Sequence, residues 1–349
     1  MANTEKTPIL SARDVEIRFS LRGRMLNAIR KCSLDLYEGE TLAIVGESGS
    51  GKSVFTKSFL GMLDANGSIT GGSILFEGND LAKYKTEKDW MRIRGKKISM
   101  VMQDPMTSLN PLKKIGRQIE ESIQLNQGLK GAELKAAALE MLRKVGIPDA
   151  ERRYNQYPHE FSGGMRQRVV IAIAVACHPQ ILICDEPTTA LDVTIQAQIL
   201  NLIRDLQREL KMTVVYITHD LGVVANVADR VAVMYAGQIV EYGMVEEIFY
   251  NAWHPYTWAL LSSLPQLGVK GEELPTIEGT PPNLFNEVKG DAFAPRNKRA
   301  LAIDFEEEPP FFDVTETHKA KTWYLDPRAP KIEQPDSIRK LRETMKGKG

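Results

Sequence analysis

A glycine-rich segment near the N-terminus has the composition of a loop that binds phosphate groups. It runs from Gly46 to Ser53 and fits the pattern G-x-x-x-x-G-K-[ST]. Its glycines let backbone N–H groups face a phosphate, and the N-terminus of a following helix adds positive potential. We expect Lys52 to reach the β- and γ-phosphates of a nucleoside triphosphate and the Ser53 hydroxyl to bind Mg²⁺. Alone, this loop, a P-loop, predicts only an NTP-binding site.

Such a loop must follow a buried strand and precede a helix. Leu42 to Val45 is a continuous apolar run that ends at Gly46, and a helix is predicted to begin near Ser53. Continuous apolar runs are typical of strands buried on both faces of a parallel sheet. Further runs of this kind occur at Ile98–Met102, Ile181–Cys184 and Thr213–Ile217. The nucleotide-binding residues are predicted to be Gly46, Glu47, Ser48, Gly49, Ser50, Gly51, Lys52, Ser53 and Val54.

Two carboxylates follow the apolar run that ends at Cys184. In enzymes with a P-loop, a strand in this place carries an aspartate near the metal. We expect Asp185 to hold Mg²⁺ directly or through water, and Glu186 to polarise the attacking water as a general base. Because carboxylates at strand ends are common on protein surfaces, the pair has this meaning only together with the P-loop.

Two other polar residues end predicted strands. Gln103 could donate to the attacking water and coordinate Mg²⁺ through its carbonyl oxygen, although any polar loop residue could occupy that position. His219 could contact the γ-phosphate and hold the water in place. A single histidine at a strand end is more often structural, so the residue alone leaves both interpretations open.

A second glycine pair precedes a predicted helix. Ser162 has the side chain of an N-cap, and Gly163 and Gly164 leave their backbone N–H groups uncovered. The segment therefore resembles a second anion site at a helix N-terminus. The alternative is an ordinary capped helix, and the segment alone favours that alternative.

Residue patterns divide the rest of the chain into a helical part and a proline-rich part. Residues from about Leu112 to Cys177 have helical periodicity, which predicts a helical subdomain inserted at about 112–178. After Pro265, frequent prolines interrupt any long element. We therefore expect one domain over residues 1–265 and an irregular C-terminal extension over residues 266–349.

Composition excludes several classes of protein. The 349 residues carry no formal net charge, which argues against bulk binding to nucleic acid. The most apolar stretch, Val169–Cys177, is far shorter than the roughly 20 residues that span a bilayer. Three cysteines in a chain of this length do not form a disulfide framework, which fits a reducing cytoplasm.

The order of these motifs resembles the ABC ATPase family over residues 8–265. The resemblance implies an α/β P-loop fold with an antiparallel β subdomain, a helical subdomain and ATP with Mg²⁺ as ligands. It also implies that two cassettes pack head to tail, so that Ser162, Gly163, Gly164 and Met165 contact ATP held by the partner. Asp192 would lie at the dimer seam, and Phe19 matches an aromatic residue that stacks on adenine.

Further segments resemble the oligopeptide-importer branch of this family, and in particular its D-type ATP-binding subunit. Besides Met165, they are Gln103–Pro111, His254–Thr257 and Ile277–Pro282. The resemblance implies a peripheral subunit on the cytoplasmic face of the cell membrane. Its partners would be a second, different ATPase subunit, two transmembrane permease subunits and, indirectly, an extracytoplasmic peptide-binding protein. An importer of dipeptides or nickel, and a non-transport ABC ATPase, are the alternatives.

The C-terminal extension departs from many relatives, which carry four cysteines there for an iron–sulfur cluster. No cysteine occurs in residues 266–349. Because such clusters need thiolate ligands, we predict no cluster and expect the extension to fold by packing. The basic tail Ile338–Lys348 predicts either a membrane-surface helix or a frayed, solvated end.

Overall fold

The computed structural model describes residues 7–189, 191–264, 277–336 and 338–339. The chain falls into two compact units. The P-loop unit comprises Pro8–Leu36, Leu42–Lys83 and the described part of Thr218–Gly349. The helical unit comprises the described part of Met1–Thr7, Tyr37–Thr41 and Tyr84–Ile217.

The P-loop unit contains a mixed sheet that begins with the strand before the P-loop. Strand β3 (Thr41–Val45) pairs in parallel with β9 (Arg230–Tyr235). The order continues through β10 (Gln238–Met244), β12 (Lys319–Lys321) and β11 (Phe311–Asp313), all antiparallel. Every residue of β3 is buried, as its continuous apolar run predicts.

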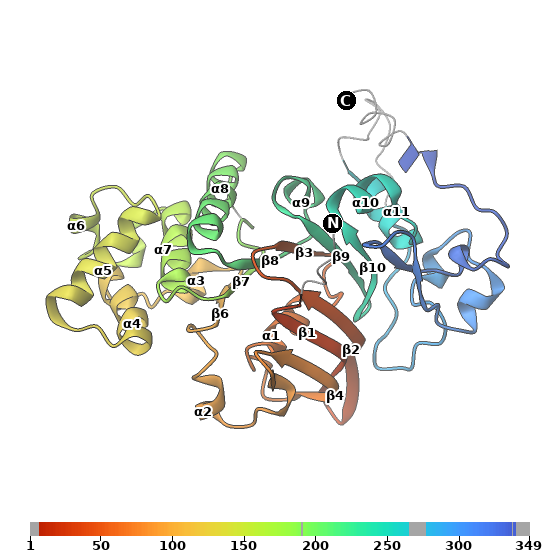
Figure 1. Ribbon diagram of the computed structural model, residues 1–349, viewed down its shortest axis with the longest axis horizontal. Coiled ribbons are helices and arrows are strands. Elements are labelled where there is room, and N and C mark those ends of the chain that lie inside the picture. The colour runs from red at the N-terminus through yellow and green to blue at the C-terminus, as the bar shows by residue number, and fades with distance from the viewer. Residues whose placement is uncertain (1–6, 190, 265–276, 337, 340–349) are drawn as a thin grey trace. The chain divides into compact units, whose positions relative to one another are not determined.

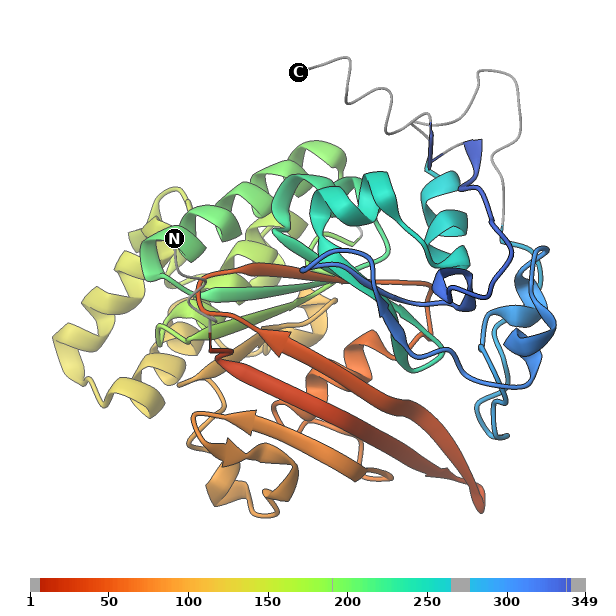
Figure 2. The same ribbon diagram turned by 45° about the vertical axis from the view of Figure 1, so that its right-hand side comes forward.

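A separate antiparallel sheet lies in the same unit and has the order β2-β1-β4-β5. Its long strands β1 (Leu10–Leu21) and β2 (Arg24–Leu36) run side by side (Figure 2). The other strands are β4 (Gly67–Phe76) and β5 (Asn79–Asp80). Val15, Ile17 and Phe19 of β1 are buried, which confirms the alternation in the sequence.

Short helices complete the P-loop unit. The α-helices are α1 (Lys52–Ser58), α9 (Leu221–Val227), α10 (Val245–Asn251) and α11 (Pro255–Ser262). The 3₁₀-helices are η1 (Leu81–Lys83), η4 (Ala294–Arg296), η5 (Ala302–Phe305) and η6 (Trp323–Leu325).

The helical unit has a small parallel sheet in which β7 lies between β6 and β8. These strands are β6 (Ile98–Val101), β7 (Ile181–Asp185) and β8 (Thr213–Thr218). Its α-helices, labelled in Figure 1, are α2 (Glu87–Trp90), α3 (Pro105–Ser108), α4 (Ile115–Gln127), α5 (Gly131–Lys144), α6 (Ala150–Arg153), α7 (Gly163–Val175) and α8 (Val193–Leu210). A 3₁₀-helix, η2, spans Pro158–Glu160.

Packing among α4, α5 and α7 forms the helical core of this unit. On α5, Leu134, Ala138 and Met141 are buried at helical spacing, and the chain turns at Gly146 with φ +73°. The helical pattern in the sequence is confirmed for this stretch.

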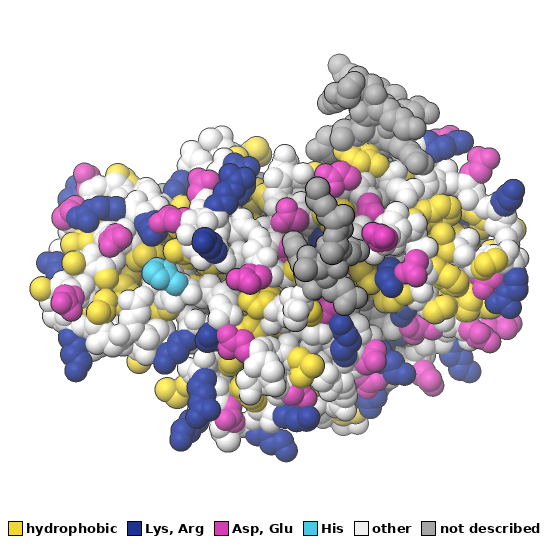
Figure 3. Space-filling model, viewed as in Figure 1, with side chains coloured by type: hydrophobic (Ala, Val, Ile, Leu, Met, Phe, Trp, Pro, Cys, Tyr) yellow, Lys and Arg dark blue, Asp and Glu magenta, His cyan; other side chains and the backbone are white. Residues whose placement is uncertain are grey.

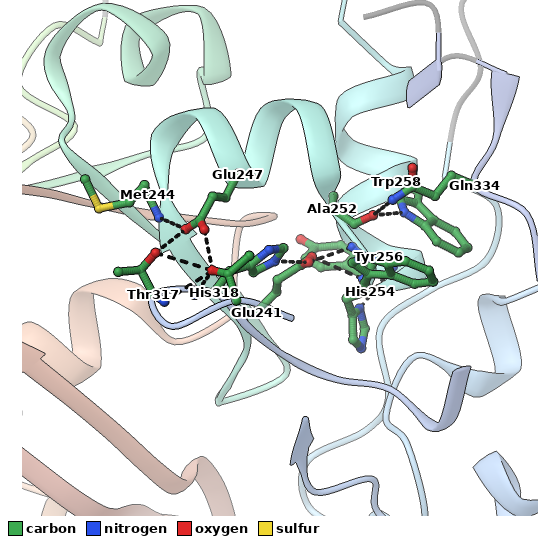
Figure 4. A network of polar contacts seen from close by, with 12 residues as sticks. Glu241, Met244, Glu247, Ala252, His254, Tyr256, Trp258, Thr317, His318 and Gln334 are labelled. Carbon is green, nitrogen blue, oxygen red and sulfur yellow. Dashed lines mark hydrogen bonds and ion pairs between the residues drawn. The ribbon is translucent and has the colours of Figure 1, made fainter. Parts of the chain in front are cut away.

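The C-terminal extension contributes the strands β11 and β12 to the sheet of the P-loop unit. The sequence predicts an irregular extension and no strands there. Glu241 of β10 pairs with Ala320 of β12, and its buried carboxylate contacts His318 Nε2 at 2.8 Å (Figure 4). The same carboxylate accepts from the backbone N–H groups of Trp253 and His254. One buried acid therefore joins β10, the start of α11 and the extension.

Aromatic rings fill the space between the extension and the rest of the P-loop unit. Phe293 is 2% exposed and lies edge-on to Tyr235. Phe311 contacts Tyr242, and Phe312 contacts Trp323. The described extension is therefore packed, as the sequence predicts, and aromatic side chains contribute to that packing. In the basic tail, Leu341, Met345 and Lys348 lie outside the described residues.

The surface mixes charges of both signs. On the face shown in Figure 3, basic and acidic side chains are interspersed, in line with the absence of net charge. Among the helices that the structure describes, none has the length and apolar character needed to cross a membrane.

Candidate active site

The P-loop lies between the end of β3 and the start of α1. Gly46 has φ +151°, and a Cβ atom at this position would lie 2.1 Å from the carbonyl oxygen of Met234. Gly51 has φ +104°, and its Cβ would lie 2.8 Å from Ile29 Cδ1. Neither backbone conformation suits a residue with a side chain. Two of the loop's glycines are therefore required by its shape.

Lys52 turns its side chain back into the loop. Its ammonium donates to the carbonyl oxygens of Gly46 at 2.7 Å and Glu47 at 2.9 Å, and its Nζ lies 3.4 Å from Ser50 Oγ. The residue is 6% exposed. A buried ammonium at the centre of a glycine-rich loop is the arrangement that phosphate oxygens fit.

Glu47 is held from two sides. Its backbone N–H donates to the hydroxyl of Tyr256 at 2.6 Å. Its carboxylate accepts a bidentate pair of hydrogen bonds from Arg296, at 2.7 and 3.0 Å. The pair raises the pKa of Arg296, and burial raises the pKa of the Tyr256 hydroxyl, which therefore stays neutral. The P-loop is thus braced by α11 and by the extension.

The remaining predicted nucleotide contacts of this unit are less enclosed. Ser48 and Gly49 are exposed, and Ser53 and Val54 on α1 are half-buried. The Phe19 ring is 9% exposed and lies over Gly67. His219 precedes α9, and the residue is exposed.

In the helical unit, the structure brings Gln103 and Glu186 together. Gln103 Nε2 donates to Glu186 Oε2 at 2.8 Å, and the hydroxyl of Thr189 donates to the same oxygen at 3.0 Å. Glu186 has φ +45°, a conformation that few residues with side chains adopt. Its N–H bonds the carbonyl of Ile217 at 2.9 Å, which holds this backbone in place.

Asp185 precedes Glu186 at the end of β7 and is 7% exposed. The proposed Mg²⁺ ligands, Ser53, Gln103 and Asp185, all offer oxygen atoms, which suit this hard cation. Gln103 contacts Glu186 through its nitrogen, so its amide oxygen is not used in that hydrogen bond. Each of these oxygen donors is therefore of a kind that magnesium accepts.

The second glycine pair caps α7. Ser162 Oγ accepts from the N–H of Met165 at 3.4 Å, while Ser162 and Gly163 are exposed. Gly164 faces Ile195 of α8, where a Cβ would lie 2.7 Å from the Ile195 side chain. Asp192 caps α8 through its carboxylate and the N–H of Ile195 at 3.0 Å. The starts of α7 and α8 therefore lie next to each other.

Sequence reasoning missed the residues that brace these loops. Arg296, Tyr235, Tyr256 and Thr189 were not predicted to belong to a site. Arg296 lies 249 positions from Glu47, so no local pattern connects them. Thr189 lies three residues after Glu186, and a hydroxyl at that spacing next to a carboxylate was a signal that could have been used.

Comparisons with known proteins agree with these features. Residues 29–189 match the family model described as ABC transporter, and residues 240–303 match the model described as oligopeptide/dipeptide transporter, C-terminal region. The oligopeptide transport ATP-binding protein AmiE of Streptococcus pneumoniae is 59% identical, covering 99% of this chain and 97% of that protein. The dipeptide transport ATP-binding protein DppD of Lactococcus lactis is 57% identical, covering 95% of each chain.

Solved structures show the same fold. The ATP-binding cassette MJ0796, in a dimeric post-hydrolysis state bound to ADP and Pi, matches with a TM-score of 0.60 and 28% identity. The match covers 68% of this chain and 98% of that one. The predicted α/β P-loop fold is therefore confirmed, and an ABC cassette binds and hydrolyses ATP. The chain belongs to the ABC transporter ATPases, in the family of oligopeptide and dipeptide transport ATP-binding proteins.

Proposed function

We propose that this chain is the ATP-hydrolysing subunit that powers import of oligopeptides through a membrane ABC transporter. The observation that carries the proposal is the 59% identity to AmiE across nearly the whole of both chains. The match of residues 240–303 to the transporter-specific C-terminal region supports the same branch. We further propose that residues 1–265 form the ATPase domain, with the helical subdomain at about 112–178, and residues 266–349 the extension.

The P-loop unit supplies the groups that bind ATP. Backbone N–H groups from Gly46 to Val54 surround the phosphates, and Lys52 exchanges carbonyl oxygens for phosphate oxygens. Phe19 is assigned to the adenine. His219 is assigned to the γ-phosphate.

The helical unit supplies the groups that act on water. Glu186 accepts a proton from the water that attacks the γ-phosphorus, and the bond between that phosphorus and the bridging oxygen to the β-phosphate breaks. Gln103 orients Glu186 through its side-chain amide. When bound by Ser53, Gln103 and Asp185, Mg²⁺ supplies charge stabilisation to the phosphates.

A second cassette completes each site in this proposal. Ser162, Gly163, Gly164 and Met165 contact ATP on the partner cassette, and Asp192 lies at the seam between the two. Binding of two ATP molecules favours the closed pair because charge-assisted hydrogen bonds then bridge two surfaces. Hydrolysis removes the bridge and lets the pair open.

The proposed partners are a second, different ATPase subunit, two permease subunits and, indirectly, an extracytoplasmic peptide-binding protein. This arrangement places the chain on the cytoplasmic face of the membrane. Import of dipeptides is the second candidate, because DppD of L. lactis is 57% identical over 95% of this chain.

A pull-down from native membranes in mild detergent tests the proposal. With this chain as bait, we expect two multi-helix membrane proteins and a second cassette protein to be identified by mass spectrometry. A parallel uptake assay with labelled di-, tri- and pentapeptides separates the two candidates. Recovery of soluble partners alone, such as ribosomal proteins, would contradict the transport role and leave only the ATPase activity.

A further inference from the structure

The P-loop carries an acidic residue, Glu47, among the groups that bind a polyanion. A carboxylate repels phosphate, and at a separation of about 8 Å in a partly buried site one unit charge changes a binding constant about tenfold or more. Glu47 is only partly exposed, at 28% of its side chain, so solvent screens it incompletely. An acidic P-loop therefore needs a compensating charge.

Arg296 supplies that charge. Its guanidinium forms the bidentate pair with Glu47 and has only 4% of its side chain exposed. The planar fork of arginine matches both carboxylate oxygens, which a lysine ammonium would not do. The carboxylate is thus paired on both oxygens by one cation from the extension.

Contacts within the extension fix the position of Arg296. Its nitrogens also donate to the carbonyl oxygens of Ile277 and Glu278 and to the Tyr235 hydroxyl. The guanidinium carbon lies 5.8 Å from the centre of the Tyr235 ring and 5.7 Å from that of Phe293. The arginine reaches Glu47 only when the segments around residues 277 and 293 are docked on the P-loop unit.

The docked extension also lines a cavity beside the loop. A space of about 190 Å³ has Glu47, Ser48, Gly49 and Ser50 on one side. On the other side are Pro281, Pro282 and Leu284, and the carbonyl of Leu284 accepts from the N–H of Asn27 on β2 at 3.0 Å. The extension therefore meets both the phosphate loop and the strand edge next to it.

We propose that Arg296 is a positioning residue that neutralises Glu47, so that tight nucleotide binding requires the docked C-terminal extension. The inference rests on the proposed role of the P-loop as the nucleotide site. Displacement of the extension leaves Glu47 uncompensated and weakens nucleotide binding. The extension then acts as a control element for ATP affinity and not only as a structural appendage.

A charge cycle on the full-length chain tests this inference. We measure ADP and ATP dissociation constants by titration calorimetry, with Mg²⁺ present, for wild type, Arg296→Met, Glu47→Gln and the double variant. Arg296→Met is expected to weaken binding about tenfold and to raise KM with little change in kcat. Glu47→Gln is expected to bind at least as tightly as wild type, and the double variant to return to within about threefold of it.

Lys298→Met is the matched control, since Lys298 pairs with Glu278 on the surface of the same segment. Lys298→Met should leave nucleotide binding unchanged. Arg296→Lys, which keeps the positive charge, should bind nucleotide more tightly than Arg296→Met and more weakly than wild type. Unchanged affinity in Arg296→Met, or an equal loss in Glu47→Gln, would overturn the inference. If Arg296→Met does not fold, the affinity of Glu47→Gln tests the inference alone. Weaker nucleotide binding in Glu47→Gln would mean that the Arg296–Glu47 pair only holds the shape of the loop and does not act by neutralising charge. Absence of binding in the wild-type chain would instead contradict the proposed nucleotide site.

Discussion

The two groups of proposed site residues are held in different ways. The P-loop is braced by partly buried contacts from distant parts of the chain, including Arg296 and Tyr256. Glu186 is held by Gln103 and Thr189 through exposed hydrogen bonds. Buried charge-assisted pairs fix a conformation, while exposed ones exchange readily with water. The comparison indicates a preorganised phosphate site and an adjustable group of residues that act on water.

Removal of the Glu186 carboxylate should have the largest effect. In Glu186→Gln we expect ATP hydrolysis to fall at least about 100-fold, because a general base is lost. ATP affinity should stay within about threefold of wild type, since the glutamine can still contact Gln103. Phosphate release and equilibrium binding measure the two quantities, and gel filtration with ATP should detect accumulated closed dimers. Glu140→Gln, an exposed change on α5, is the control. Turnover at the wild-type rate in Glu186→Gln would mean that Glu186 is not the base.

The backbone shape of the P-loop should make it sensitive to side chains at its glycines. Two of these glycines, Gly46 and Gly49, provide a matched pair of substitutions. In Gly46→Ala the new Cβ would lie 2.1 Å from the Met234 carbonyl, so we expect a loss of about 3 kcal/mol in the free energy of unfolding. In Gly49→Ala nothing lies within 4 Å, although φ is +79°, so the loss should be about 1 kcal/mol. Urea unfolding measures both, and calorimetry with ADP reports the site itself. Equal losses in the two variants would show that strain at positive φ, and not the close contact, sets the loop's tolerance.

The sequence predicted the parts of the fold whose signal is local. Leu42–Val45 is apolar throughout and becomes β3, and Leu134, Ala138 and Met141 recur at helical spacing and become the buried face of α5. The strands β11 and β12 were missed because each has three residues, which are too few to show the alternation of a strand. Their place is set by pairing with β10, which is a tertiary contact.

The same limit applies to the candidate site. Local patterns predict Lys52, Asp185 and Glu186 as site residues, because each lies in a glycine-rich loop or directly after an apolar run that can be seen in the sequence. They do not identify Arg296, whose role depends on an acid 249 positions away. Nor do they show how the charge of Glu47 is compensated, because the compensating cation is brought to the loop by the docked extension, which is a tertiary contact.

A smaller effect is expected in the pH dependence of the free energy of unfolding, and it concerns the contacts that support the P-loop. Burial raises the pKa of Asp291 to about 7, against an ordinary value of 3.8, with Asp304, Glu308, Lys321 and His254 also near it. Asp291 accepts from the N–H of Phe293, whose ring packs against Tyr235 and Tyr256 beside Glu47. The P-loop side of the molecule is therefore supported by a buried titratable group.

The sign of the effect follows from proton binding. Between about pH 4 and pH 7 the folded chain holds a proton on Asp291 that the unfolded chain releases, so the free energy of unfolding falls as pH rises through this window. Asp291→Asn removes the dependence and keeps an oxygen that can accept from Phe293. Relative to this variant, wild type should lose about 2 kcal/mol between pH 5 and pH 7 and only roughly 0.4 kcal/mol more above pH 7, where the remaining half of the Asp291 side chains lose their proton. His254, whose pKa burial lowers to about 3, contributes the opposite slope in both proteins and cancels.

Urea unfolding at pH 5, 6, 7 and 8 measures the difference between wild type and Asp291→Asn. Asp313→Asn, an exposed change in the same extension, is the control and should track wild type at every pH. Parallel curves for wild type and Asp291→Asn would mean that Asp291 is ionised throughout, held so by its charged neighbours. The contacts that support the P-loop would then involve an Asp291 carboxylate that stays charged at every pH. The difference between these contacts and the exposed hydrogen bonds around Glu186 would not change with pH.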